Sequence, residues 1–345
     1  MPAYNMEDYI SRSLNSILID EILKHIEVII VNDGSKDNTL EIAKQFERQY
    51  PDSIIVVDKE NGNYGSTINK AIEIATGKYI KTLDSDDWYD SESFVKFIKE
   101  LERCKEDLII NGYSYYFDDE KRRIPAFTYK ERHWNKTFNI TDNNLYKLKL
   151  DYQLNMPAMT FKTSIIRDAN FKLQEKTYYT DTEYVYYPFS NTRTIRLLPI
   201  DLYIYYIGRS EQSVSPENLL KNFDSKYRII KKMIYNYIES PKNQFSENKK
   251  YMLIKNTAGF YNYLYISDKY RNEINEIENI IKSNDLSLYK EIGENIRIYG
   301  VKYVKLHREG YDNVYIKERI SNAKKIRNSY PYRILRKLTH IIQRI

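Results

Sequence analysis

The sequence contains one cysteine, Cys104, in 345 residues, and a single thiol cannot form an intramolecular disulfide. No apolar stretch approaches the ~20 residues that a membrane-spanning helix requires. The first residues also lack the charged and then apolar layout of a signal peptide, so we expect a cytoplasmic protein. Because no histidine lies near Cys104 in the sequence, we interpret this thiol as an incidental residue rather than a nucleophile.

Glycine is scarce too, at 10 residues, and Gly62 and Gly65 do not form a dinucleotide-binding fingerprint. That fingerprint needs a third glycine and a position directly after the first strand. A hydrophobic content of 42% and a charged content of 30% are typical of a soluble globular protein. The length allows one large domain, or one domain with a sizeable appendage.

Strand-like and helix-like segments alternate over the first third of the chain. Short apolar runs that end in turn residues predict strands at residues 26–35, 53–63 and 78–87. Apolar side chains at helical spacing predict helices at residues 36–50 and 65–77, the second closed by Gly77. Strands separated by single helices predict an α/β fold with a mostly parallel sheet flanked by helices.

Acidic residues follow two of these strands. Asp33 ends the first, and Asp84, Asp86 and Asp87 follow the third. Ligands bind at the carboxyl edge of open α/β sheets, so we expect both turns to lie at one edge of one sheet and to share a site. The three clustered carboxylates have two interpretations: they cap the following helix, or they hold Mg²⁺ or Mn²⁺ together with substrate phosphate. With Asp33 as a separate acceptor for a base or ribose, the second interpretation predicts a nucleotide-diphosphate site.

Beyond residue 111 the pattern changes. Aromatic alternation predicts a hairpin or an irregular cover, and residues 156–171 predict a strand, a turn and a short helix. Around residues 177–189 we expect a loop that leads into a short helix, which Pro188 ends or kinks. Amphipathic helical stretches dominate from Ser215 to the end of the chain.

Four separated segments carry a family resemblance. They are MPAYN at residues 1–5, IIVNDGSKDNT at 29–39, ENGNYGSTINKAIEIATGKYIKTLDSDDW at 60–88 and YTDTEYVYY at 179–187. In this order and spacing they resemble the family-2 glycosyltransferases, which implies the GT-A nucleotide-diphospho-sugar transferase fold. The expected division is a catalytic domain at residues 1–215 and a helical C-terminal region at residues 216–345.

The resemblance implies a donor site built from the first three segments. The turn of Pro2, Ala3 and Tyr4 would line the nucleotide pocket, with Tyr4 near the base. Asp33 would accept a hydrogen bond from uracil or an equivalent base.

The acidic turn would complete that donor site. Asp84 would face the ribose or a metal-bound water, and Asp86 would ligate the Mg²⁺ or Mn²⁺ that bridges the two phosphates. Asp87 would support the turn or cap the next helix. We interpret Trp88 as a packing residue.

The resemblance also implies a catalytic base, for which Asp181 is the first candidate and Glu183 the second. The base must lie within about 3 Å of the acceptor oxygen. The alternative is that Asp181 caps the helix that follows it. Thr180 stands where many members have a glutamate. Arg209, in a segment found after the base in many members, would bind the diphosphate, or would instead be a surface residue.

Two further departures from the family's pattern stand out. Many members carry an arginine where this chain has Ile68, and neither Lys70 nor Lys81 can be assumed to replace that diphosphate contact. A buried strand normally precedes the Pro2 turn, so we expect the natural protein to begin upstream of Met1.

The C-terminal tail is basic and amphipathic. One helical face of residues 332–345 carries most of its apolar side chains, namely Ile334, Leu335, Leu338, Ile341, Ile342 and Ile345. This pattern is typical of an interfacial helix, which predicts weak peripheral attachment to the inner face of the cell membrane. The alternative is a terminal helix docked on the protein's own core.

Together these features predict an inverting, metal-dependent glycosyltransferase of hexosyltransferase type. It would move a sugar from a nucleotide-diphospho-sugar donor, with UDP expected, to a hydroxyl of a surface glycan or a lipid-linked acceptor. The alternative is a catalytically weak nucleotide-sugar-binding assembly subunit. Nucleic acid is not expected as a partner, because the tail has no recognisable reader motif.

Overall fold

The computed structural model describes the chain in six stretches and three single positions. They are residues 1–127, 133–140, 154–208, 220–243, 246–266 and 269–328, with 145, 148 and 150 between the second and third stretches. The chain divides into two compact units, residues 1–229 with 241–249 and residues 230–240 with 250–345. The boundary predicted after residue 215 lies outside the described residues. Among the described residues, no helix has both the length and the apolar character needed to cross a bilayer.

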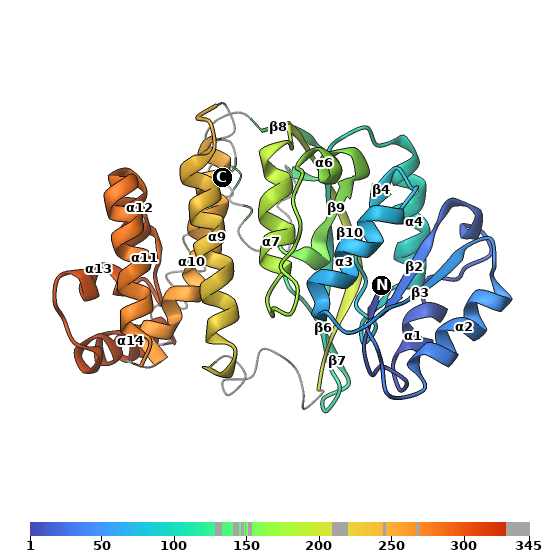
Figure 1. The fold of residues 1–345 in the computed structure, drawn as a ribbon, viewed down its shortest axis with the longest axis horizontal. Coiled ribbons are helices and arrows are strands. Elements are labelled where there is room, and N and C mark those ends of the chain that lie inside the picture. The colour runs from blue at the N-terminus through green and yellow to red at the C-terminus, as the bar shows by residue number, and fades with distance from the viewer. Residues whose placement is uncertain are drawn as a thin grey trace. The chain divides into compact units, whose positions relative to one another are not determined.

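The first sheet of the first unit is parallel and follows the predicted alternation (Figure 1). Its strands are β1 (Pro2–Ala3), β2 (Val28–Asn32) and β3 (Ile54–Asp58), in that order. The connecting helices are α1 (Ile10–Asn15), η1 (Leu23–His25) and α2 (Thr39–Gln49). All five residues of β2 are buried, because helices cover both of its faces. Strand β1 is only two residues long and pairs in parallel with the end of β2.

The second sheet is mixed. Its main path is β4 (Tyr79–Ile80), β9 (Met159–Lys162), β6 (Leu108–Phe117), β10 (Thr194–Ile207) and β5 (Trp88–Tyr89). Two short strands pair beside this path, β7 (Arg122–Pro125) with β6 and β8 (Thr137–Asn139) with β10. Within this sheet β6 and β10 are parallel, and the other pairs are antiparallel. The expectation of one sheet carrying both acidic turns is therefore wrong: Asp33 follows β2 of the first sheet and Asp84 follows β4 of the second.

Two helices connect or flank these strands near the predicted site. Helix α3 (Asn63–Ile74) begins before the predicted residue 65 and ends before Gly77. Helix α4 (Ser91–Arg103) is capped by Asp90, whose carboxylate accepts a hydrogen bond from the Ser93 amide at 3.0 Å. Since Asp90 takes the capping role, the capping interpretation of Asp84, Asp86 and Asp87 is wrong.

The remainder of the first unit supplies short helical segments. They are η3 (Met156–Ala158), α6 (Thr163–Asp168), α7 (Asp181–Tyr186) and η4 (Tyr187–Ser190). The hairpin expected after residue 111 is the β6–β7 pair, and the strand and short helix expected at residues 156–171 are β9 and α6. Helix α7 ends directly before the η4 turn that contains Pro188, as predicted.

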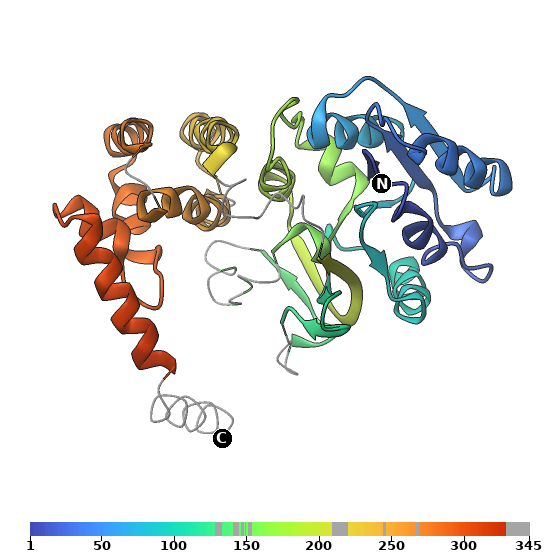
Figure 2. The same cartoon turned by 90° about the horizontal axis from the view of Figure 1, so that it is seen from below.

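Helices build the described part of the second unit, drawn orange to red in Figure 2. They are α11 (Arg271–Asn284), α12 (Leu286–Asn295), α13 (Tyr303–Arg308) and α14 (Asn313–Asn328), with parts of α9 (Phe223–Glu239) and α10 (Ser246–Ile266). A half-buried ion pair ties them together: Arg308 Nε lies 2.6 Å from Glu278 Oε2. The guanidinium also lies 3.6 Å from the centre of the Tyr289 ring.

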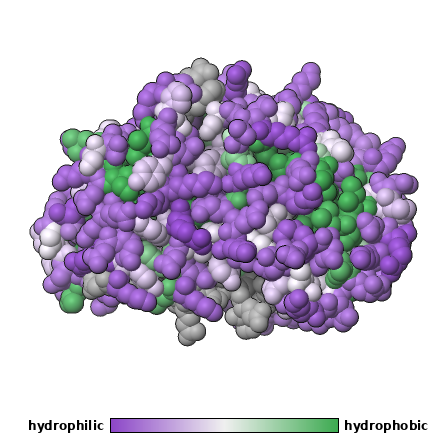
Figure 3. Space-filling model, viewed as in Figure 1, coloured by the Kyte–Doolittle hydropathy of each residue, from purple (hydrophilic) through white to green (hydrophobic). Residues whose placement is uncertain are grey.

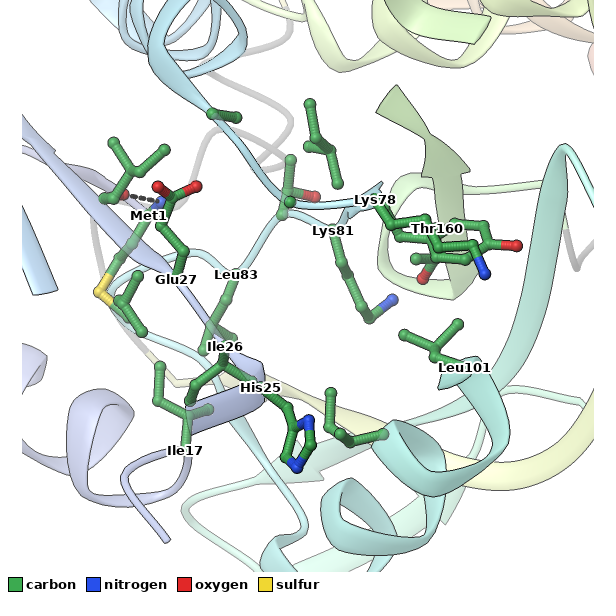
Figure 4. Close-up of a pocket in the computed structure, with 18 of the residues that line it drawn as sticks. Met1, Ile17, His25, Ile26, Glu27, Lys78, Lys81, Leu83, Leu101 and Thr160 are labelled. Atoms are coloured by element: carbon green, nitrogen blue, oxygen red, sulfur yellow. Dashed lines mark hydrogen bonds between the residues drawn. The ribbon is translucent and has the colours of Figure 1, made fainter. Parts of the chain in front are cut away.

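An apolar cavity of about 320 Å³ lies in the first unit, between β2 and α3 on one side and β4 and α4 on the other. Figure 4 shows Met1 and Ile26 on one side of it and Lys81 and Thr160 on the other. On the face seen in Figure 3 the surface is mostly hydrophilic, and apolar side chains gather over the part of the first unit that contains β2. No predicted catalytic carboxylate lines the cavity, so it belongs to the core and not to the site.

Candidate functional site

The carboxylates of the acidic turn between β4 and β5 lie in different environments. The side chain of Asp87 is buried, and it accepts hydrogen bonds from the Tyr203 hydroxyl at 2.5 Å and the Tyr206 amide at 2.7 Å. Both donors belong to β10, which pairs with β5. Asp87 thus anchors the turn to the sheet, the supporting role predicted for it.

Asp84 lies on the opposite side of the turn and has a different partner. Its Oδ1 accepts a hydrogen bond from the Tyr64 hydroxyl at 2.8 Å. Burial, together with the charge of Asp86, raises the pKa of Asp84 to about 7. The acidic side chains of the turn therefore lie close enough for the charge of one to raise the pKa of another. Tyr64 was not predicted as a site residue, because its contact with Asp84 joins residues that are 20 positions apart in the sequence.

Asp33 is held by the segment that leads into α3. Its Oδ1 accepts hydrogen bonds from Lys59 Nζ at 2.9 Å, the Gly62 amide at 3.0 Å and Ser66 Oγ at 3.3 Å. All three donors contact the same oxygen, which leaves Oδ2 without a hydrogen bond among the described residues. One oxygen fixes the side chain, and the other can accept a bond from a ligand.

The short strand β1 brings Asp33 and the acidic turn together. The Ala3 carbonyl accepts a hydrogen bond from the Asp33 amide at 2.9 Å. The Pro2 carbonyl accepts one from Ser85 Oγ at 2.5 Å. The two turns therefore flank Pro2 and Ala3, although they follow strands of different sheets.

The residues after β1 present an aromatic side chain next to Asp33. Tyr4 is 45% exposed. Asn5 adopts a left-handed conformation (φ 53°), and its side chain accepts a hydrogen bond from the Lys36 amide at 2.9 Å. This contact ties the turn to the loop after Asp33 and leaves the Tyr4 ring available for stacking.

Asp181 is the first residue of α7, and Thr180 is the residue before the helix. The alternative of Asp181 as the capping residue is therefore wrong, since Thr180 holds that position without a side-chain cap. Asp181 is exposed, and its charge contributes to the raised pKa values of Asp84 and Tyr64. The predicted base thus lies close enough to the acidic turn to interact with it electrostatically.

Glu183, the second candidate for the base, is fully buried. Its carboxylate accepts hydrogen bonds from the Gln174 amide at 2.8 Å and the Gln174 side chain at 3.3 Å. These bonds hold the loop that precedes α7. Glu183 therefore has a structural role, which leaves Asp181 as the exposed carboxylate of this helix.

The loop before α7 is fixed to α3 by several contacts. Asn69 exchanges two hydrogen bonds with the main chain of Leu173, both at 2.9 Å. The Lys176 amide donates to the Gly62 carbonyl at 2.7 Å. Gly65 lies so close that a Cβ added there would be 2.3 Å from the Gln174 carbonyl oxygen. Helix α3 thus positions Asp33, Asp84 and the loop that leads to Asp181.

A lysine that the sequence did not single out lies beside α7. Lys226 Nζ donates a hydrogen bond to Thr182 Oγ1 at 3.2 Å. Burial lowers the pKa of Lys226, and the charge of Asp181 opposes that shift. The base candidate therefore has a cation near it.

The other cations considered from the sequence do not contribute to this group. Lys81 Nζ donates to Asn111 Oδ1 at 2.9 Å and to the Pro157 carbonyl at 2.8 Å, away from the acidic turn. Lys70 pairs with the exposed Glu73, and Ile68 is buried against the apolar cavity. Arg209 lies outside the described residues.

The carboxylates suit a metal shared with a substrate rather than a complete protein cage. No group of three or more His, Cys, Asp or Glu side chains that could hold a metal occurs in the described part of the chain. Tyr203 and Tyr206 hold Asp87, so the candidate metal ligands of this turn are the carboxylates of Asp84 and Asp86. Mg²⁺ is commonly held by one or two carboxylates together with substrate phosphates, and these residues fit that arrangement.

Comparison with known proteins agrees with this geometry. The family described as Glycosyl transferase family 2 matches residues 1–167. A Mycoplasma genitalium protein, named as an uncharacterized glycosyltransferase, is 30% identical over 238 residues, which span 68% of this chain and 75% of that protein. A poly(ribitol-phosphate) beta-glucosyltransferase of Bacillus spizizenii is 30% identical over 177 residues, which span 49% of this chain and 25% of that protein.

A solved structure extends the likeness to most of the chain. The crystal structure of S. aureus TarS 1–349 in complex with UDP-GlcNAc has a TM-score of 0.64 at 17% identity, and the match covers 93% of this chain and 87% of that one. The protein described here belongs to glycosyl transferase family 2. The predicted fold class and the predicted class of enzyme, a glycosyltransferase, are confirmed.

Substitution of Gly65 by alanine tests the contact between α3 and the loop before α7. We expect Gly65→Ala to lower stability by about 1–3 kcal/mol, because a Cβ there overlaps a main-chain oxygen. Thermal unfolding measures the change. The matched control is Gly77→Ala, whose Cβ would be 3.4 Å from the Tyr79 carbonyl oxygen and should be tolerated. Equal stability of the two variants would contradict the proposed close contact.

Lys81 predicts a specific pH dependence of stability. Burial lowers its pKa from 10.5 to about 7. Between these values the unfolded chain holds a proton that the folded chain lacks, so the contribution of Lys81 to stability increases with pH, by at most about 1.4 kcal/mol per unit. Denaturant unfolding at pH 7 and pH 9 should show a gain for wild type relative to Lys81→Met. Parallel stability profiles for the two proteins would contradict the lowered pKa.

Proposed function

We propose that the protein is an inverting, metal-dependent glycosyltransferase that transfers a sugar from a UDP-sugar to a hydroxyl of a surface glycan or a lipid-linked acceptor. One observation carries the proposal: Asp33 and the acidic turn flank Pro2 and Ala3, and Asp181 interacts electrostatically with Asp84. This arrangement supports one site with three functions. One carboxylate would accept a hydrogen bond from the nucleobase, a pair of carboxylates would face the phosphates, and a further carboxylate would accept a proton from the acceptor.

The donor's nucleotide would bind at β1 and the loop after β2. Asp33 Oδ2 would accept the N–H of a uracil, while Oδ1 keeps its bonds to Lys59, Gly62 and Ser66. The exposed ring of Tyr4 would stack on the base. The fold likeness to TarS, whose structure contains UDP-GlcNAc, supports a UDP-sugar as the donor.

The diphosphate would face the acidic turn. Asp86 would hold Mg²⁺ or Mn²⁺, and Asp84 would accept from the ribose or from a metal-bound water. A divalent cation in this position supplies neutralising charge for the leaving diphosphate. Tyr64 would keep Asp84 oriented through its hydrogen bond to Oδ1. Arg209, outside the described residues, is proposed as a further diphosphate contact.

Asp181 would accept the proton of the acceptor hydroxyl as that oxygen attacks the anomeric carbon. Its exposure at the start of α7 leaves it accessible to an acceptor. Lys226 would stabilise the ionised carboxylate that this role requires. Thr180 stands where many family members have a glutamate, but the proposed catalytic base, Asp181, is the next residue and is present.

A polymer of the cell surface is the proposed acceptor. One relative is named a poly(ribitol-phosphate) beta-glucosyltransferase. If the acceptor of the protein described here is a polymer on a lipid carrier, that acceptor would lie at a membrane surface. The basic tail at residues 332–345, outside the described residues, would then provide peripheral attachment at the inner face of the cell membrane.

Calorimetric titration of UDP tests the donor site. We expect Mn²⁺ to strengthen UDP binding to wild type, and Asp86→Asn to remove that gain. The loss of Mn²⁺-dependent UDP affinity should reach at least ~10–100-fold, which is the effect of mutating residues that only support a metal ligand. The matched control is Asp52→Asn, an exposed carboxylate in the turn before β3. UDP binding with no dependence on Mn²⁺ in wild type would exclude the metal role.

A pair of isosteric substitutions tests the base. Asp181→Asn should lower kcat for UDP-sugar turnover by about 10²–10⁴-fold and leave UDP affinity unchanged. Glu183→Gln should lower the thermal midpoint, because it weakens the bonds to Gln174. The measurements are UDP release, calorimetry and thermal unfolding. Full activity of Asp181→Asn would exclude this base, and UDP binding without turnover in wild type would favour the assembly subunit.

A further inference from the structure

Helix α1 lies against the main chain of the acidic turn. Arg12 Nη2 donates a hydrogen bond to the Asp86 carbonyl oxygen at 2.8 Å. Ser13, the next residue of the helix, donates from Oγ to the Asp84 carbonyl oxygen at 3.4 Å. One short helix therefore contacts the main-chain carbonyls of Asp84 and Asp86, the residues on either side of Ser85.

Aromatic rings surround the guanidinium of Arg12 and restrict its position. Its Cζ lies 3.9 Å from the centre of the Trp88 ring, 4.7 Å from that of Tyr206 and 5.9 Å from that of Tyr9. A cation over aromatic faces gains about 0.5–1 kcal/mol at exposed sites. The side chain is exposed, yet these contacts hold it over the turn.

The same rings belong to the framework that anchors Asp87. Trp88 is part of β5 and pairs with Ile204 of β10. The Tyr206 amide donates to Asp87 Oδ1 at 2.7 Å. Arg12 thus links the anchored side of the turn to the main-chain carbonyl of Asp86.

Charge supports the same role. Arg12 carries a guanidinium that stays protonated in proteins, and it lies next to a turn with three carboxylates. Its charge is opposite to theirs, and its hydrogen bond restricts the peptide that follows Asp86. A carboxylate on a restricted peptide loses less conformational entropy when it binds a cation.

We propose that Arg12 is a positioning residue for the metal-binding carboxylate of Asp86. It acts through the Asp86 main chain and does not touch the metal or the donor. This inference rests on the proposed function, because it assigns Asp86 to the metal.

The experiment compares Arg12→Ala and Arg12→Lys with wild type by calorimetric titration of UDP, with and without Mn²⁺, and by thermal unfolding. Arg12→Ala should weaken Mn²⁺-dependent UDP binding by about threefold to tenfold, equivalent to one hydrogen bond, and leave metal-free UDP binding unchanged. Arg12→Lys keeps the charge and a donor but loses the planar stacking, so it should recover part of the affinity.

Arg167→Ala is the matched control. Arg167 also donates to main-chain carbonyls, at 2.7 Å to Ala75 and 3.0 Å to Ile72, but at the far end of α3. This variant should lose stability without any change in Mn²⁺-dependent UDP binding.

Two results would overturn the inference. The first is Mn²⁺-dependent binding by Arg12→Ala that equals wild type, and the second is an equal loss of binding in Arg167→Ala, which would indicate a general effect of destabilisation. Failure of the proposed function has a different signature: wild type itself would show no Mn²⁺-dependent UDP binding, and the role of Arg12 would then be excluded with it.

Discussion

Mutual repulsion between the carboxylates of one turn is the constraint on which the site depends. Asp84, Asp86 and Asp87 lie within four residues, and the side chain of Asp87 is buried. A buried carboxylate remains tolerable only when donors or cations compensate it. The surrounding elements supply those donors unequally: β10 satisfies Asp87 and α3 contributes Tyr64 to Asp84. Three identical side chains therefore acquire three different roles from their neighbours.

Helix α3 carries more of this organisation than any single motif does. Its first turns contact Asp33, Asp84 and the loop before α7, so one helix sets the spacing between these three parts of the candidate site. A side chain at Gly65 would overlap the Gln174 carbonyl oxygen of the loop before α7, and one at Gly62 would overlap the Ser66 side chain in the first turn of α3. Gly62 and Gly65 do not form a dinucleotide-binding fingerprint, and they permit close packing at the start of α3.

The sequence predicted the features that depend on local pattern. The apolar runs gave β2 and β3, helical spacing gave α2 and most of α3, and the motifs gave Asp33, the acidic turn and α7. Partners distant in the chain could not be predicted, because nothing near Asp87 indicates that Tyr203, 116 residues away, donates to it. The division into two sheets was missed for the same reason, since β4 pairs with β9, a strand about 80 residues further on. Tyr64, Arg12 and Lys226 carried no motif signal, and their roles follow from tertiary contacts alone.

The apolar cavity beside β2 and β4 has a volumetric consequence for the whole first unit. Pressure favours the state with less void volume, so the packing around this space of about 320 Å³ is one determinant of the response to pressure. Thr82 and Leu83 line the cavity and lead directly into the acidic turn. A change in packing around this space would therefore reach the segment that carries the acidic turn.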